Sequence, residues 1–315
     1  MSDASIEVVN RPPVNSAAAI RSLVEAAADA DGAAPLSEHV YLHLTHGGDV
    51  SDEHVLLWSG DRLVAYGHLD TTDRVAGASG EVVVHPQFRR QGYGTMLVGE
   101  LAARSPAGKL RLWAHGAQPG AVALAQRLGF LRTRTLWQMR RSLLSPMPAP
   151  VLPPGVTVRP LRVGSDEERW LAVNNRAFAG HPEQGRWTID DVRMRESESW
   201  FDPAGFFLAE QGGEIVAFHW TKVHGSIEHG GHEHPPVGEV YVVGVDPAAQ
   251  GLGLGKALTL VGLRHLRSAG LLQVMLYVDD DNPAAIAIYE GLGFSRWDSD
   301  VTFAMDAQTP QTSSL

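Results

Sequence analysis

Two copies of one pattern decide the fold: Val82-Val83-Val84-His85-Pro86-Gln87-Phe88-Arg89-Arg90-Gln91-Gly92-Tyr93-Gly94 and Val243-Gly244-Val245-Asp246-Pro247-Ala248-Ala249-Gln250-Gly251-Leu252-Gly253-Leu254-Gly255. Each copy predicts a β-strand, a turn that contains glycine, and a helix. Such a turn presents backbone N–H groups at the start of the helix, where a pyrophosphate can bind. We therefore expect two α/β units, each with a cradle for an anionic ligand.

The sequence around the two copies repeats in the same order. Apolar runs at 55–58 and 63–68 flank a Ser-Gly-Asp turn, and runs at 206–209 and 215–220 flank a Gln-Gly-Gly turn. Both arrangements predict β-hairpins. The repeat is about as long as a whole domain, whereas the repeats of solenoid proteins span about 20–50 residues. The chain is therefore predicted to contain a duplicated domain.

Proline marks the boundary between the two copies. The segment from Ser145 to Gly155 is rich in proline, which removes N–H donors and disfavours helix. We predict an N-terminal domain at 1–143, a linker at 144–155, a C-terminal domain at 156–307 and a frayed tail at 308–315.

The composition excludes several classes of function. The 315 residues carry a formal net charge of −10, which disfavours nucleic acid and anionic membranes as partners. Their apolar runs are too short to span a membrane. The chain has no cysteine, which excludes disulfides, thiolate metal sites and a cysteine nucleophile. We expect a cytoplasmic protein, monomeric because the duplication already supplies two domains.

The pattern resembles the GCN5-related N-acetyltransferases: a strand, then Gln/Arg-x-x-Gly-x-Gly/Ala, and later an Asn and a Tyr before Gly-Phe. Arg89 to Gly94 and Gln250 to Gly255 carry the resemblance, so it covers nearly the whole chain twice. It implies two tandem domains of this family, each a mixed central sheet flanked by helices. It also implies acetyl-CoA as cosubstrate, without a metal.

Three segments of the second half are similar to the mycothiol synthases within that family: Asn174 to Gly185, Phe218 to His224, and Gly238 to Pro247. This resemblance implies acetyl transfer from acetyl-CoA to the cysteinyl amine of cysteinyl-glucosaminyl-inositol, the last step of mycothiol biosynthesis. Two alternatives stay open. One is a tandem acetyltransferase for another amine, such as an aminoglycoside or a protein N-terminus, and the other is a non-catalytic acetyl-CoA sensor.

The resemblance also implies which residues hold acetyl-CoA. In the family, the strand before the turn binds the pantetheine arm and one of its N–H groups polarises the thioester carbonyl. In the first copy the candidates are Val82, Val83, Val84, Arg90, Gln91, Gly92, Tyr93, Gly94 and Thr95. In the second copy they are Val243, Gly244, Val245, Gln250, Gly251, Leu252, Gly253, Leu254, Gly255, Lys256, Asn282, Pro283, Ala284, Ala285, Ile286 and Ala287.

Glu239 is the candidate base. Because an amine is largely protonated at neutral pH, it must lose a proton before it attacks the thioester. Strand alternation places Glu239, Tyr241, Val243 and Val245 on one face if no bulge intervenes. Partial burial there would raise the pKa of the Glu239 carboxyl towards working pH. The alternative is a glutamate at the start of the strand that faces water.

Tyr289 is the candidate acid that assists departure of the CoA thiolate. Asn282 and Pro283 predict an N-cap and a first helical residue, and Tyr289 falls on the same helical face two turns later. The alternative is a core aromatic residue. For the acceptor, the resemblance implies binding by Glu38, Glu183, Lys222, Glu239 and Tyr277, which from their residue type alone would mostly be solvated surface groups.

The first copy lacks these reactive groups. Alignment of the Gly-Phe pairs places Ala125 and Gln118 where the second copy has Tyr289 and Asn282. Alignment of the glycine turns places Ala78 where the second copy has Glu239, and the nearest acid, Glu81, falls on the other face of the strand. We therefore predict a catalytic second domain and a first domain that keeps only the cradle.

A cluster of histidines near the end of a predicted strand is the one metal candidate in the sequence. It contains His224, His229, His232 and His234 between glycine and proline pairs. No regular element fixes the spacing of these side chains, so we predict a loop without a functional metal.

Overall fold

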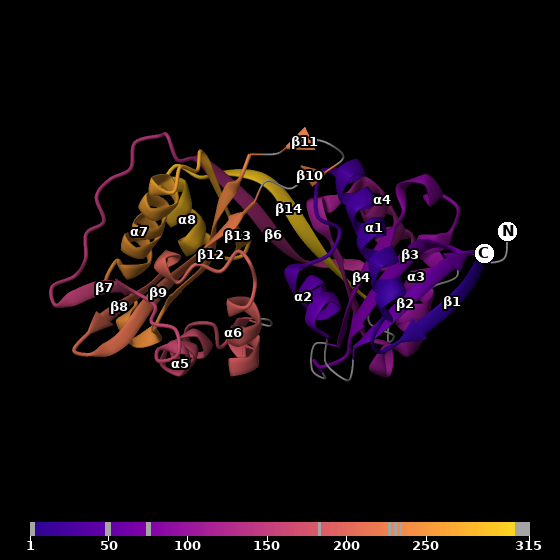
Figure 1. Cartoon of the computed structure of the whole chain (residues 1–315), viewed down its shortest axis with the longest axis horizontal. Coiled ribbons are helices and arrows are strands. Elements are labelled where there is room, and N and C mark those ends of the chain that lie inside the picture. Colours follow the sequence, from indigo (N-terminus) through magenta and orange to yellow (C-terminus); the bar gives the residue numbers. More distant parts are fainter. Residues whose placement is uncertain are drawn as a thin grey trace. The chain divides into compact units, whose positions relative to one another are not determined.

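The computed structural model describes residues 4–47, 52–73, 77–181, 184–225, 228–229, 232–233 and 235–305 (Figure 1). The chain forms two compact units. Unit 1 comprises Met1–Leu136 and Asp298–Leu315, and unit 2 comprises Trp137–Trp297. The predicted frayed tail lies outside the described residues.

Unit 1 is a mixed sheet with helices on both faces. Its strands, in spatial order, are β1 (Ala4–Val9), β2 (Glu53–Ser59), β3 (Arg62–Asp70), β4 (Ala78–Val84), β5 (Leu110–Ala114), and parts of β14 (Ser295–Met305) and β6 (Leu131–Ser142). Strands β4 and β5 are parallel, and the pairs β1–β2, β2–β3, β3–β4 and β5–β14 are antiparallel. The helices are α1 (Val14–Asp31), α2 (Glu38–His46), α3 (Tyr93–Arg104) and α4 (Pro119–Arg127), with short 3-10 helices η1 (Pro86–Phe88), η2 (Pro106–Gly108) and η3 (His115–Ala117).

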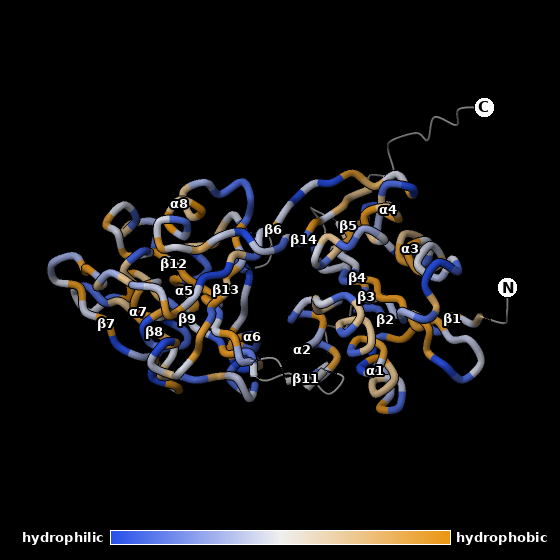
Figure 2. Tube along the Cα trace, turned by 90° about the horizontal axis from the view of Figure 1, so that it is seen from above, coloured by the Kyte–Doolittle hydropathy of each residue, from blue (hydrophilic) through white to orange (hydrophobic). Residues whose placement is uncertain are grey.

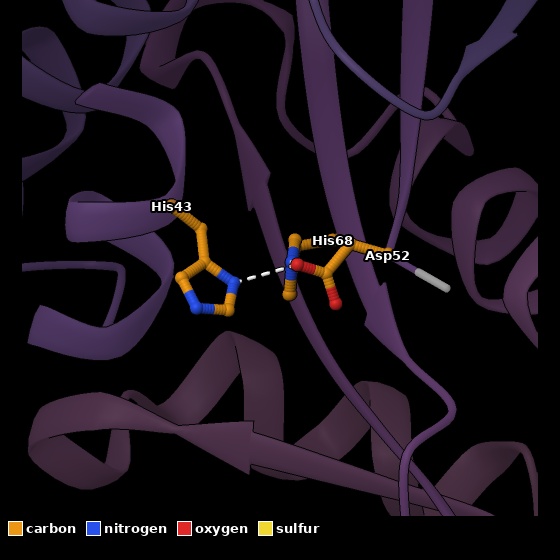
Figure 3. Close-up of side chains that lie close together, drawn as sticks. All are labelled: His43, Asp52 and His68. Atoms are coloured by element: carbon orange, nitrogen blue, oxygen red, sulfur yellow. Dashed lines mark hydrogen bonds and ion pairs between the residues drawn. The ribbon is translucent and has the colours of Figure 1, made fainter. Parts of the chain in front are cut away.

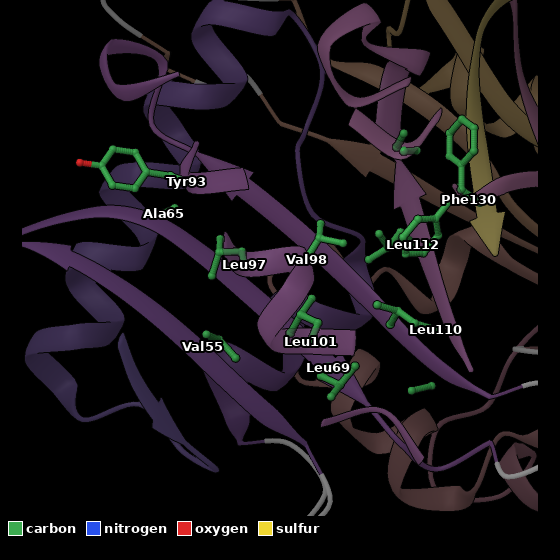
Figure 4. Packing of buried hydrophobic residues seen from close by; sticks show 14 of the residues in the cluster. Val55, Ala65, Leu69, Tyr93, Leu97, Val98, Leu101, Leu110, Leu112 and Phe130 are labelled. Carbon is green, nitrogen blue, oxygen red and sulfur yellow. The ribbon is translucent and has the colours of Figure 1, made fainter. Parts of the chain in front are cut away.

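Alternation along the strands of unit 1 produces two cores. Leu97 and Leu101 of α3 pack with Val55 and Leu57 of β2 on one face (Figure 4). Leu56, which lies between Val55 and Leu57, packs on the other face with residues of α1 and α2. A strand buried on both faces is apolar at nearly every position, and Figure 2 shows such apolar stretches along the strands of this unit.

Unit 2 repeats this architecture. Its strands, in spatial order, are part of β6, then β13 (Gln273–Asp279), β12 (Val237–Val245), β9 (Glu214–His224), β8 (Phe206–Gln211) and β7 (Val156–Pro160). Strands β12 and β13 are parallel, and the pairs β12–β9, β9–β8 and β8–β7 are antiparallel. The helices are α5 (Glu167–Ala177), α6 (Ile189–Glu196), α7 (Leu254–Ser268) and α8 (Pro283–Gly291), with η4 (Gln184–Arg186), η5 (Pro203–Gly205) and η6 (Pro247–Ala249). A separate ribbon pairs β10 (Glu228–His229) with β11 (His232–Glu233).

The two faces of the unit 2 sheet differ in character. On the face of α7 and α8 the core is aliphatic and includes Leu263 and Leu266 of α7. On the face of α5 and α6 it is aromatic, with Trp170, Phe206 and Trp220 fully buried. The Phe206 and Trp220 rings stack with centroids 4.5 Å apart. Aromatic packing of this kind stabilises a core beyond the burial of apolar area alone.

The packing units differ from the predicted domain boundaries at two strands. The boundaries 1–143 and 156–307 assign all of β6 to the first domain and all of β14 to the second. Packing instead divides β6 after Leu136 and β14 after Trp297. Both predicted hairpins are confirmed as β2–β3 and β8–β9, and the proline-rich segment at 144–155 contains no helix or strand. No described helix has the length and apolar composition needed to cross a membrane.

Candidate active site

The glycine turn of unit 2 leads from β12 through η6 into α7. Gly251 and Gly253 have φ angles of 81° and 78°, which glycine adopts without strain. Gly253 is the N-cap of α7, and it has no side chain to accept hydrogen bonds from the first N–H groups of the helix. Those N–H groups, together with the helix dipole, can hold an anion.

The turn of unit 1 has the same backbone but different side-chain partners. Gly92, the N-cap of α3, has a φ of 93°, and Arg90 adopts a φ of 64° at the position that Gly251 occupies in unit 2. Arg89 makes a bidentate ion pair with Asp31, with N–O distances of 2.6 and 2.8 Å. The Arg89 guanidinium is therefore engaged in a protein contact rather than directed at the cradle.

Strands β12 and β13 separate before they end. Gly238 pairs with Val274 and Glu239 with Met275, and among the described residues no later pair joins the two strands. Beyond this point β12 still pairs with β9 on its other edge, as far as Val245. The backbone groups of Val243 to Val245 that face β13 are therefore available to an extended ligand, which is where the sequence predicts the pantetheine arm.

A β-bulge in β12 changes which side chains share a face. The register with β9 shifts between Val240 and Val242, so Tyr241 is an extra residue in the strand. Val243 packs in the aliphatic core on the α7 face, whereas Tyr241 and Val242 pack in the aromatic core. The predicted common face of Glu239, Tyr241, Val243 and Val245 is therefore wrong, because it assumed a regular strand.

Glu239 is buried and lies on the aromatic face. Its neighbour Gly238 faces α7, since a Cβ there would meet Leu266 and Leu271. Only 7% of Glu239 is exposed, and its Oε2 lies 2.7 Å from Nε2 of His224. The water-facing alternative for Glu239 does not fit this burial.

Lys222 and Tyr277 lie on the same face of the sheet as Glu239. Lys222 is the cross-strand partner of Glu239, and its ammonium lies 4.3 Å from the centroid of the Trp200 ring. Tyr277 alternates with the core residues of β13, and its hydroxyl accepts a hydrogen bond from Gln138 at 2.8 Å. Strand pairing and alternation thus bring three of the predicted acceptor residues to one face.

Tyr289 lies on α8, on the α7 side of the sheet. Asn282 caps this helix as predicted, with Oδ1 accepting from the Ala285 N–H at 3.1 Å. The Tyr289 ring packs against the aliphatic core and meets the Phe294 ring edge-on, with centroids 5.9 Å apart. Burial raises the pKa of Tyr289 to about 12, so its hydroxyl stays protonated at neutral pH.

The other two predicted acceptor residues are not tested by this arrangement. Glu38 is the first residue of α2 in unit 1, and Glu183 lies outside the described residues. The side chains of His229, His232 and His234 also lie outside the described residues.

Pairing in the sheet corrects the alignment of the two units. Strand β4 pairs with β3 without a bulge, and Ser79 lies opposite Asp70. In unit 2, Glu239 lies opposite Lys222 at the corresponding position of β9. The counterpart of Glu239 is therefore Ser79 and not Ala78, because the bulge inserts one residue into β12.

The bulge also places Glu81 on the same face as Ser79, contrary to the prediction from the sequence alignment. Glu81 accepts a hydrogen bond from the Ser37 N–H at 2.7 Å and lies 3.6 Å from Nε2 of His115, whose Nδ1 lies 3.0 Å from Asp300. Burial disfavours the charged carboxylate, but the pairing with His115 and Ser37 outweighs it and lowers the pKa of Glu81 to about 2. A carboxylate with so low a pKa is a weak base at neutral pH.

His224 is the functional residue that the sequence analysis left without a role at this site. It lies two residues from Lys222 on β9, and residues two apart on a strand share a face. That alternation was the available signal. The contact between His224 and Glu239 depends on the pairing of β9 with β12, which local sequence does not reveal.

Comparison with known proteins gives the same fold and a consistent family. A model described as the acetyltransferase (GNAT) family matches residues 20–130 and again residues 170–294. A mycothiol acetyltransferase of Acidothermus cellulolyticus is 57% identical over 291 residues, which cover 90% of this chain and 89% of the relative. A mycothiol acetyltransferase of Streptosporangium roseum is 52% identical over 338 residues, covering 96% and 99%.

Solved structures support the tandem architecture. A GCN5-related N-acetyltransferase from Sphaerobacter thermophilus aligns with a TM-score of 0.66 at 28% identity, over 96% of this chain and 95% of that chain. A tandem GNAT protein from the clavulanic acid biosynthesis pathway aligns with a TM-score of 0.71, over 98% and 100% of the two chains. At 17% identity, the second likeness concerns the fold alone.

Proposed function

Because this chain belongs to the acetyltransferase (GNAT) family, and within it to the mycothiol acetyltransferases, we propose that it acetylates the cysteinyl amine of cysteinyl-glucosaminyl-inositol with acetyl-CoA. This is the reaction that the sequence resemblance implies. We further propose that unit 2 performs the chemistry. The observation that carries this assignment is a buried carboxylate, Glu239, at the point where β12 and β13 separate and above the glycine turn of α7.

The backbone of unit 2 fits acetyl-CoA. The N-terminal N–H groups of α7 suit its pyrophosphate, and the edge of β12 from Val243 to Val245 suits the amides of its pantetheine arm. An N–H of this edge would donate a hydrogen bond to the thioester oxygen. Such a donor acts as an oxyanion hole when the carbonyl carbon becomes tetrahedral.

Glu239 would take the proton of the acceptor ammonium, directly or through a water. The free amine then attacks the thioester carbon, a C–N bond forms, and the C–S bond breaks as the intermediate collapses. His224 holds Oε2 of Glu239 and so orients the carboxylate, and Lys222 on the same face can bind the sugar or inositol oxygens. The proton on Glu239 returns to solvent after the products leave.

Tyr289 would act on the departing sulfur from the opposite face. A phenol with a pKa of about 12 is a weaker acid than a thiol, whose reference pKa is about 8.5. The main contribution of Tyr289 is therefore the hydrogen bond that its protonated hydroxyl donates to the developing thiolate. We propose that unit 1 keeps a cradle without this chemistry, and that the protein works as a cytoplasmic monomer.

The test is acetyl transfer by the full chain to a panel of amines, followed by the release of free CoA. Cysteinyl-glucosaminyl-inositol should give a kcat/KM at least 100-fold above those for aminoglycosides and peptide N-terminal amines. Comparable values for the other amines would favour a different acetyltransferase. CoA binding with no release for any amine would favour the sensor.

A further inference from the structure

A second cluster of reactive side chains lies in unit 1, away from the cradle (Figure 3). His43 comes from α2, Asp52 from the residue before β2, and His68 from β3. His43 Nδ1 lies 2.6 Å from Asp52 Oδ2, and His68 Nε2 lies 3.9 Å from the same oxygen. One ligand atom from each of the three residues falls within 4.8 Å of the others.

All three side chains are buried. His43 is 7% exposed, Asp52 0% and His68 1%. The Nε2 atom of His68 has no hydrogen-bond partner among the described residues, although it points at the Asp52 carboxylate. Buried polar atoms without a partner are rare in proteins, and a bound water or ion often satisfies such an atom.

The distances suit a small metal ion. Zinc bonds of about 2.0–2.1 Å place tetrahedral ligand atoms about 3.3 Å apart, between the two separations observed here. The His43–Asp52 contact would lengthen by about 0.7 Å as the shared proton gives way to the ion. Burial alone raises the pKa of the Asp52 carboxyl, but the hydrogen bond of His43 and the nearby His68 outweigh it, so the carboxylate is ionised as a ligand must be.

We propose that His43, Asp52 and His68 form a structural zinc site in unit 1. Imidazole and carboxylate ligands suit Zn²⁺, and full burial of the donors leaves no path for a substrate, which argues for a structural role. The fourth ligand is water or His39, whose ring lies one helical turn before that of His43 with centroids 4.0 Å apart. The ion fastens α2 to strands β2 and β3.

The experiment uses the untagged full chain, stripped with a chelator and titrated with Zn²⁺ alone. We expect one zinc per chain by elemental analysis and a rise in the midpoint of thermal unfolding. Co²⁺ in place of zinc should give the visible absorption of a four-coordinate nitrogen and oxygen site. Neither readout depends on acetyl transfer.

Variants locate the ion. His68→Gln should weaken zinc binding at least 100-fold, while His85→Gln, a histidine of unit 1 outside the cluster, should leave it unchanged. A triple change of His229, His232 and His234 to Gln should also leave it unchanged. Zinc lost in the triple variant, or retained at wild-type affinity in His68→Gln, would overturn the proposal.

The wild-type protein keeps the test decisive if His68→Gln does not fold. A stripped wild-type chain that neither binds micromolar Zn²⁺ nor develops absorption with Co²⁺ would show that protons alone satisfy the cluster, and the proposal would then be wrong.

Discussion

Unit 1 and unit 2 share a backbone but differ in the side chains that face the cradle. Both lead a strand through a glycine turn into a helix without a side-chain cap. Unit 2 adds a bulge that brings a buried glutamate beside the separating strands, whereas unit 1 has Ser79 there. Backbone determines where an anion can bind, and a few side chains determine whether chemistry follows.

The helix that follows each turn packs on its sheet with opposite partners. In unit 1, Gly67 of β3 faces Leu101 of α3, and a Cβ on Gly67 would lie 3.5 Å from that leucine. In unit 2 the corresponding strand residue is His219 and the corresponding helix residue is Gly262, whose added Cβ would overlap the imidazole. The same space is filled from the helix in one unit and from the strand in the other.

The largest expected effect is on catalysis. Glu239→Gln and Tyr289→Phe should each lower kcat by about 10²–10⁴-fold, the range typical of general acid–base groups. Ser79→Ala and Glu81→Gln, the matched changes in unit 1, should leave kcat within about threefold, provided that unfolding midpoints confirm intact folds. A Glu81→Gln enzyme as inactive as Glu239→Gln would end the division of labour between the units.

The second effect is a pH dependence confined to unit 1. Burial opposes the charge on His115, but Asp300 and Glu81 outweigh it and raise the pKa of His115 to about 10. The stability from His115 is present below its unfolded value of about 6.5 and lost as pH rises to about 10. That from Glu81, with its pKa lowered to about 2, is present above about 4.5 and lost as pH falls.

Amide hydrogen exchange, resolved by unit, measures this prediction. Unit 1 should lose on the order of 2 kcal/mol between pH 6.5 and 10, and His115→Gln should remove most of that slope. Unit 2 has Val242 at the position of Glu81 and should show no comparable slope from this position. Equal slopes in both units, or a slope unchanged in His115→Gln, would contradict the assignment.

The third effect concerns packing. Gly262→Ala should destabilise unit 2 by about 1–3 kcal/mol, because overpacking outweighs the better helix propensity of alanine. Gly67→Ala should change unit 1 by less than about 1 kcal/mol, since its Cβ meets the leucine at an ordinary contact distance. The double variant His219→Gly with Gly262→Leu, which copies the arrangement of unit 1, should recover stability relative to Gly262→Leu alone in denaturant unfolding.

The smallest effect concerns His224. His224→Ala should lower kcat by about tenfold, because Glu239 loses the hydrogen bond that orients it and keeps its carboxylate. The pH profile of kcat should shift as well, which loss of structure alone would not cause. His85→Ala is the control for removing a histidine elsewhere. A pH profile identical to wild type would assign His224 a purely structural role.

The sequence by itself determined the features that local chemistry specifies. Glycine at positive φ, Asn282 followed by proline, and alternating apolar runs predict the turns, the capped helix α8 and the hairpins, because each depends on neighbouring residues. The duplication of these signals indicated two acetyltransferase-like domains.

Only the tertiary structure decided which side chains meet. The bulge at Tyr241, the exchange of Ala78 for Ser79 as the counterpart of Glu239, and the contact of His224 with Glu239 all depend on strand register. The cluster of His43, Asp52 and His68 joins a helix, a loop and a strand. Register and such long-range contacts are set by packing of the whole unit, so no local pattern in the sequence encodes them.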